Sequence, residues 1–109
     1  MYDDKIISVS LGDSRSILGI ENWAGFVPVS LSVEHNTSNK KEVARVLQEG
    51  GIIQPIMTEN GQYIGPDRVW NKSLKVPGLQ VTRGFGDLIG KDCGVSGNPG
   101  KIIYTIFFN

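Results

Sequence analysis

A short alternating run at residues 77–87, with the sequence PGLQVTRGFGD, limits the possible folds of this chain more than any other segment. Leu79, Val81 and Phe85 fall on one side of an extended backbone, whereas the polar residues, including Thr82, fall on the other. A proline and a glycine begin the run and two glycines lie near its end, so turns are expected at both ends. The run predicts a half-buried strand that the rest of the chain is built to reach.

Several short motifs precede this run in a fixed order. They are GDSRS at residues 12–16, Glu34 and His35, Glu42 and Arg45 before Gly50 and Gly51, and Arg68 with Val69. This order resembles the protein phosphatase 2C family of metal-dependent serine/threonine phosphatases. The family pattern reads Gly-Asp-Ser-Arg, Asp-His, Glu and Arg then Gly-Gly, Arg-Val, and Gly-Leu-Ala-Val-Ser-Arg-Ala-Phe-Gly-Asp. Each motif alone is weak, and the resemblance depends on their order over residues 6–99.

The resemblance implies an α+β fold in which antiparallel sheets form a sandwich flanked by helices. Residues 1–99 are expected to be part of such a catalytic domain. The family has an acid after the proline at position 99, but here Gly100 and Lys101 follow it. Residues 100–109 are therefore expected to be a tail outside the family pattern, as in a truncated or extended gene product.

The resemblance also implies a catalytic centre with two Mg²⁺ or Mn²⁺ ions that activate a water molecule. Its acidic motifs are expected before Met1 and after Asn109, so we expect no catalytic residue in this chain and no activity from it alone. Glu34 stands where the family has an aspartate that contributes to a peripheral third metal site. The extra methylene moves the carboxylate by about an ångström, so a metal ligand and a plain surface acid both remain open.

A hairpin is predicted at residues 52–64, because Asn60 and Gly61 lie between two apolar segments and favour a primed turn. The resemblance places this flap beside the catalytic cleft. Tyr63 and Trp70 could therefore contact a substrate or a partner protein, with simple packing as the alternative.

A helix is predicted before the glycine pair. Asn39 can cap it, Glu42 stands in the capping-box position, and Gly50 can end it in a left-handed conformation. The apolar stripe is expected to be Val43, Val46 and Leu47, and the solvated mixed-charge face Lys40, Lys41, Glu42, Arg45 and Glu49.

Two strand regions are predicted near the N-terminus. Residues 5–20 read as a strand pair or one bent strand, interrupted at Gly12, and residues 26–33 read as the next strand, with Pro28 favouring an edge position. Asp13 and Arg15 are expected to form a local ion pair or a turn hydrogen bond.

Composition narrows the partners but does not identify them. The chain has 11 Lys and Arg and 11 Asp and Glu, so no net charge favours nucleic acid or an anionic membrane. The single cysteine, Cys93, excludes an internal disulfide and is expected to be a free thiol. No secretory signal is apparent in the sequence, and we expect a cytoplasmic or nuclear protein.

Two functions of different kinds follow. The first is a part of a phosphatase that acts on phosphoserine or phosphothreonine in phosphoproteins. The second is a non-catalytic, phosphatase-like module that binds a kinase or scaffold. In either case we expect self-association through exposed sheet edges, aided by the β-prone tail at residues 102–108.

Overall fold

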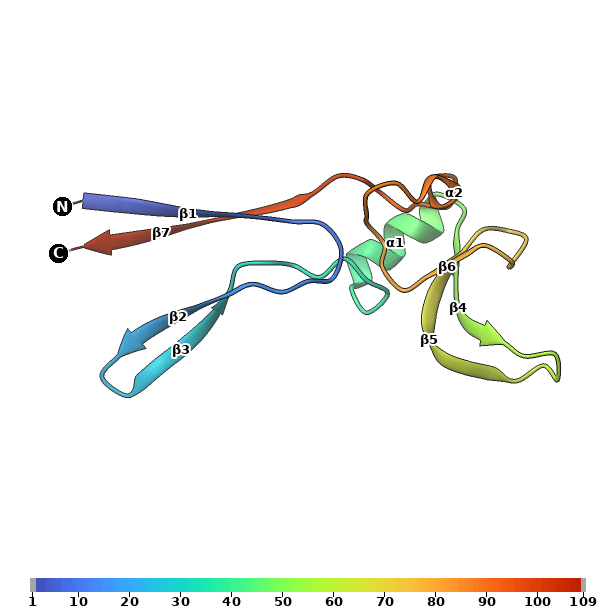
Figure 1. Ribbon diagram of the computed structural model, residues 1–109, viewed down its shortest axis with the longest axis horizontal. Helices are drawn as coiled ribbons and strands as arrows, with labels where there is room; N and C mark the ends of the chain where they lie inside the picture. The colour runs from blue at the N-terminus through green and yellow to red at the C-terminus, as the bar shows by residue number, and fades with distance from the viewer. Residues whose placement is uncertain (1, 109) are drawn as a thin grey trace.

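The computed structural model describes residues 2–108 and shows an elongated molecule of 61 × 27 × 20 Å (Figure 1). Antiparallel strands form three small sheets, joined by two helices, so the predicted α+β class is confirmed. The radius of gyration is 18.0 Å, whereas a compact domain of this size has a radius of gyration of about 13 Å. The excess arises because two ribbons of strands extend from one side of a helix-containing body.

The two ribbons occupy one end of the molecule, where both chain termini also lie (Figure 1). Strand β1 (Tyr2–Ser10) pairs with β7 (Gly100–Phe108), and β2 (Ile17–Asn22) pairs with β3 (Gly25–Ser30). The predicted interruption after residue 10 is confirmed, with Gly12 at φ 96°. The two strands on either side of it do not pair with each other, because β1 pairs with the far end of the chain instead. The strand predicted for residues 26–33 ends three residues early.

The body contains α1 (Lys40–Gln48), whose predicted ends are confirmed. The Asn39 side chain accepts a hydrogen bond from the backbone N–H of Lys41 at 3.0 Å, which satisfies one free donor of the first turn. At the other end Gly51 N–H donates to the carbonyl of Val46 at 2.8 Å, and Gly50 has φ 84°. This bond pattern is a Schellman motif, which requires the left-handed residue that glycine supplies.

A three-stranded antiparallel sheet follows the helix, formed by β4 (Ile52–Met57), β5 (Tyr63–Trp70) and β6 (Pro77–Leu79). The predicted hairpin is confirmed, but the primed turn predicted for it is wrong. Thr58 N–H donates to the carbonyl of Gln62 at 2.8 Å, and Gly61 alone of the Asn60–Gly61 pair has a positive φ, 77°. The loop is therefore a three-residue connection with glycine in the left-handed position rather than a two-residue primed turn.

The run at residues 77–87 departs from its predicted form. Only its first three residues belong to a strand, after which Val81 and Arg83 make single bridges to Asn36 and Ser96. Thr82 is fully buried and Phe85 is 91% exposed, so the predicted assignment of faces is wrong for both. The reason is that the segment crosses beneath α1, where Thr82 finds an internal hydrogen-bond acceptor, and Phe85 then lies in an exposed glycine-flanked loop before α2 (Leu88–Lys91).

The core is small and lies wholly in the body. Val46, Val69, Cys93 and Val95 are buried, with Ile53 and Leu79 packed against them. Leu47, predicted to belong to the apolar stripe, is exposed because the sheet covers only the side of α1 that carries Val46. Cys93 is a free, buried thiol, and burial raises its pKa. Within residues 2–108 no helix has the length and apolar character needed to span a membrane.

Candidate functional site

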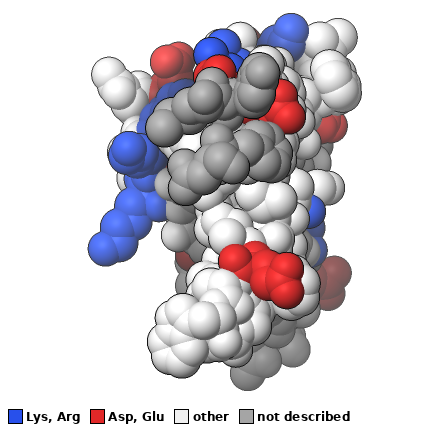
Figure 2. Space-filling view, turned by 90° about the vertical axis from the view of Figure 1, so that its left-hand side faces the viewer, with Lys and Arg blue, Asp and Glu red and all other residues white. Residues whose placement is uncertain are grey.

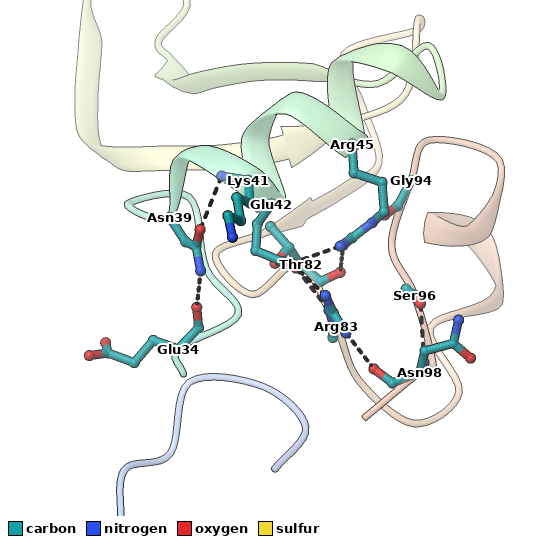
Figure 3. A network of polar contacts seen from close by, with 10 residues as sticks. All are labelled: Glu34, Asn39, Lys41, Glu42, Arg45, Thr82, Arg83, Gly94, Ser96 and Asn98. Carbon is teal, nitrogen blue, oxygen red and sulfur yellow. Dashed lines mark hydrogen bonds and ion pairs between the residues drawn. The ribbon is translucent and has the colours of Figure 1, made fainter. Parts of the chain in front are cut away.

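A buried carboxylate, Glu42, is the centre of the main polar cluster (Figure 3). Its residue is only 3% exposed. One oxygen, Oε1, accepts hydrogen bonds from Arg83 Nη2 at 2.7 Å and Arg45 Nη1 at 2.8 Å. The other, Oε2, accepts from the Thr82 hydroxyl at 2.7 Å and from Arg83 Nε at 3.0 Å. Both oxygens are therefore fully engaged inside the protein.

The two arginines extend this cluster to three segments of the chain. Arg45 Nε donates to the carbonyl of Gly94 at 3.1 Å, and its Nη2 donates to the carbonyl of Thr82 at 2.9 Å. Arg83 Nη1 donates to the carbonyl of Asn98 at 2.9 Å. The cluster thus ties α1 to the segment at residues 82–83 and to the loop at residues 94–98, and it holds these three in one arrangement.

The placement of Glu42 and Arg45 on a solvated face was wrong. A signal in the sequence could have shown it, because Glu42 lies four residues before the buried Val46 and therefore shares its face of the helix. Such an inward-pointing acid needs a cation, and Arg45 lies three residues further along the same helix. The second cation, Arg83, is 41 residues away and could not be found from local spacing.

The environment of Glu42 determines its charge. Burial by itself raises the pKa of this carboxyl, but hydrogen bonds from Arg83, Arg45 and Thr82 more than offset burial and lower the pKa from 4.5 to about 2. Glu42 is ionised at neutral pH and has no proton to donate. Its role in this chain is to position the segments around it.

His35 is buried beside this cluster, with 2% of its surface exposed. Its backbone joins two segments, since its N–H donates to the Gly12 carbonyl at 2.9 Å and its carbonyl accepts from Thr82 N–H at 2.8 Å. Burial, and then the positive charge of Arg83, lower the pKa of the imidazole, so His35 is neutral at neutral pH. His35 is thus a packing residue whose backbone holds two segments together.

Glu34 lies at the surface, next to the start of α1. Its Oε1 forms an ion pair with Arg15 Nε at 2.6 Å, and its Oε2 accepts a hydrogen bond from Asn36 Nδ2 at 3.2 Å. Asn39 Nδ2 donates to its carbonyl at 3.0 Å. The prediction that Arg15 pairs locally with Asp13 was wrong, because the chain returns to place Glu34 beside Arg15.

These donors do not suffice for a metal ion. Among residues 2–108 no three histidine, cysteine, aspartate or glutamate side chains gather closely enough to hold one. Glu34 offers one carboxylate, and its partner there is an arginine rather than a second acid. A metal role for Glu34 requires further ligands from outside this set and stays a prediction.

The two aromatic residues of the flap differ in exposure. Trp70 is half-buried, its indole N–H donates to the Gln54 carbonyl at 2.8 Å, and its ring covers Gly78, where a Cβ would lie 2.9 Å from Cη2. Tyr63 is 59% exposed at the start of β5. Trp70 is thus held in place by packing and Tyr63 is free to be contacted, but a role in substrate or partner binding stays a prediction for both.

Comparison with known protein families matches residues 1–105 to the family described as protein phosphatase 2C. Probable protein phosphatase 2C 48 of Oryza sativa subsp. japonica is 30% identical over 103 residues, which are 90% of this chain and 28% of that protein. Probable protein phosphatase 2C 38 of the same organism is 36% identical over 93 residues, 83% of this chain and 19% of that protein. The family match runs beyond residue 99, and the domain boundary proposed there stays a prediction.

Solved structures share this fold. The serine-threonine phosphatase 2C from Toxoplasma gondii superposes with a TM-score of 0.72 on 94% of this chain and 34% of that chain, at 24% identity. A C. elegans sex determining protein superposes with a TM-score of 0.66 at 26% identity, on 94% of this chain and 21% of that chain. The chain therefore spans between about a fifth and a third of the proteins it matches.

Proposed function

Because this chain belongs to the protein phosphatase 2C family, we propose that it is part of a catalytic domain that hydrolyses phosphoserine and phosphothreonine in phosphoproteins. In this proposal Mg²⁺ or Mn²⁺, held by residues beyond this chain, supplies the activated water. The observation that carries the proposal is the family match over residues 1–105, together with the agreement in fold.

The residues of this chain take supporting roles in the proposal. The Glu42 cluster fixes α1 against residues 82–98, so that the sheet beside it keeps one geometry. Glu34 serves as a peripheral metal ligand, and Tyr63 and Trp70 form part of a flap beside the cleft. None of these residues acts as the nucleophile or the general acid.

The test uses a chimera, because this chain covers only part of its relatives. Residues 1–105 replace the matched segment of the Oryza sativa probable protein phosphatase 2C 48, and manganese-dependent hydrolysis of a small phosphate ester and a phosphoserine peptide is measured. We expect turnover from the chimera and none from the 109-residue chain. A chimera that folds, by circular dichroism and a cooperative melt, but does not turn over would contradict the proposal.

Glu34 is tested in the same chimera. Glu34→Gln should weaken activation by manganese, whereas Glu49→Gln, an exposed acid at the end of α1, should leave it unchanged. Any manganese-dependent rate of the 109-residue chain that survives Glu34→Gln and removal of host phosphatases would show that catalysis does not depend on residues outside the chain.

The alternative is a non-catalytic, phosphatase-like module that binds a kinase or scaffold. It is favoured by the exposed side chains of Met57, Tyr63 and Ile64 on the flap. The coding sequence on both sides of this chain distinguishes the two functions, because aspartate motifs there support the phosphatase and stop codons support the module.

A further inference from the structure

A hollow of about 230 Å³ lies where the end of β1, the start of β7 and the first turn of α1 meet. Its lining includes His35, Lys41, Glu42, Arg83, Gly100 and Lys101. Pockets for drug-sized molecules begin at about 300 Å³, so this hollow suits a small ion rather than a larger ligand.

The charges around the hollow are unbalanced. Three of its lining residues are cationic, Lys41, Arg83 and Lys101, against one acidic residue, Glu42. That carboxylate is already satisfied, since each of its oxygens accepts two hydrogen bonds from the protein. Neither lysine forms an ion pair with any residue of the described part of the chain. The hollow therefore has cationic donors without an anionic acceptor.

Unused donors are also present on Arg83. A guanidinium has five N–H groups, and hydrogen bonds from Nε, Nη1 and Nη2 of Arg83 account for three of them. Figure 3 shows the Lys41 side chain beside that of Glu42 at the start of α1. Arg83 and Lys41 line the hollow from different segments of the chain.

Gly100 lies against the imidazole of His35 in the lining of the hollow. A Cβ at this position would lie 3.0 Å from His35 Nε2 and 3.1 Å from its Cε1. The backbone of Gly100 has no positive φ that would demand glycine. Gly100 is thus packed closely against the imidazole edge, where a side chain would not fit without displacing His35.

We propose that this hollow binds a small oxyanion of the phosphate class. Lys41, Lys101 and the free N–H groups of Arg83 donate to its oxygens, as charge-assisted hydrogen bonds of this kind are the strong ones. Inorganic phosphate and the phosphate group of a phosphorylated side chain share this chemistry. The site needs no metal ion and stands apart from the proposed phosphatase reaction.

His35 is the single histidine of the chain, so its imidazole signals report on the hollow without ambiguity. The 109-residue chain is titrated with inorganic phosphate at neutral pH and constant ionic strength, and the His35 signals are followed by NMR. We expect a saturable shift. A phosphoserine peptide and its unphosphorylated form are the second arm. A tighter response to the phosphopeptide than to inorganic phosphate identifies a phosphorylated side chain as the ligand, and the reverse identifies the free ion.

Lysine variants test the assignment of the site. The double variant Lys41→Gln and Lys101→Gln should weaken phosphate binding about tenfold, because two partly solvated ion pairs are lost. Lys40→Gln and Lys75→Gln remove the same charge from positions outside the hollow and should leave the affinity unchanged. An equal loss of phosphate affinity in both double variants would show that only the net charge of the chain matters, and it would overturn the proposal.

Lys101→Glu gives an independent test, because it reverses a charge in the lining of the hollow. This variant should lose the phosphate response of His35 and keep the far-ultraviolet circular dichroism of the parent chain. The proposal fails if the His35 signals of the parent do not shift on addition of phosphate, or if the shift never saturates.

Discussion

The two ends of this molecule use the same antiparallel strands, but only one of them encloses a core. In the body Val46 and Val69 are completely buried between α1 and the three-stranded sheet. In the ribbons Ile7, Val9 and Ile103 are each more than half exposed, although they lie on paired strands of good register. Regular pairing alone therefore does not bury apolar side chains.

The difference shows what a small sheet needs for stability. A two-stranded ribbon has two faces and is marginal by itself in water, whereas a sheet with a helix against it closes one face. The ribbons face each other across a groove of about 400 Å³ between β2 and β7, which leaves their outer faces uncovered. Figure 2 looks onto this end and shows uncharged side chains along its middle, with lysines and arginines on one side and acidic residues at several points. The relatives are three to five times longer than this chain, and their additional residues are numerous enough to cover such faces.

The largest expected effect is on the ion cluster of the body. Glu42→Gln removes the charge that Arg45 and Arg83 share in a buried position, and we expect a loss of about 3 kcal/mol in the free energy of unfolding. Glu49→Gln on the same helix is the matched control and should change it by less than about 0.5 kcal/mol. Urea denaturation measures both, and equal midpoints would show that the cluster contributes nothing.

The same carboxylate should make the body sensitive to acid. Its pKa is about 2 in the folded protein and 4.5 ordinarily, so the unfolded state binds the proton more readily. The stabilisation is complete above pH 4.5 and is lost as the pH falls toward 2, by an amount on the order of 3 kcal/mol. Urea midpoints between pH 6 and pH 2 measure this loss, and Glu42→Gln should flatten the curve. A wild-type curve no steeper than that of the variant would contradict the low pKa.

Truncations compare the two ends directly. Val46→Ala should cost about 2 kcal/mol, because it leaves a cavity in the core. Ile7→Ala removes more carbon atoms but should cost less than about 0.5 kcal/mol, since the side chain is 61% exposed. Similar losses in thermal melts would mean that the outer face of the β1–β7 ribbon is covered in solution.

The flap should show a smaller effect. Gly61 has φ 77° with open space around its Cα, so Gly61→Val is disfavoured by backbone strain and not by a clash. We expect a cost of about 1 kcal/mol. Gly97→Val is a control at an exposed glycine without a positive φ and with ordinary contacts. An unchanged melting temperature for Gly61→Val would show that Gly61 does not adopt the left-handed conformation of this turn in solution.

Substitutions in the ribbons should have the smallest effect on folding. They should have a clear effect on self-association. Their apolar faces and free strand edges should make the chain self-associate at micromolar concentration. Ile103→Lys, opposite Ile7 on the paired strand, should shift sedimentation toward the monomer with little change in stability. Lys101→Gln is a control on the same strand. A single monomeric species that is unchanged when residues 102–109 are deleted would show that the ribbons need no partner.

Elements with local signals could be predicted from the sequence. Asn39 and Gly50 placed the ends of α1, because capping and the left-handed glycine act within one turn of the chain. Gly61 placed the hairpin for the same reason, and the order of motifs identified the family. The helix caps and the hairpin turn depend on neighbours a few residues away, which a sequence displays directly.

The contacts between distant segments could not be predicted in this way, because they depend on how the whole chain folds. Glu42 turned inward because Arg83, 41 residues away, arrives beneath α1, and β1 pairs with β7 from the opposite end of the chain. Glu34 found Arg15, and Thr82 became buried, through the same return of the chain. A buried charge is stable only where oppositely charged or hydrogen-bonding partners contact it, and no local sequence pattern specifies contacts between distant residues.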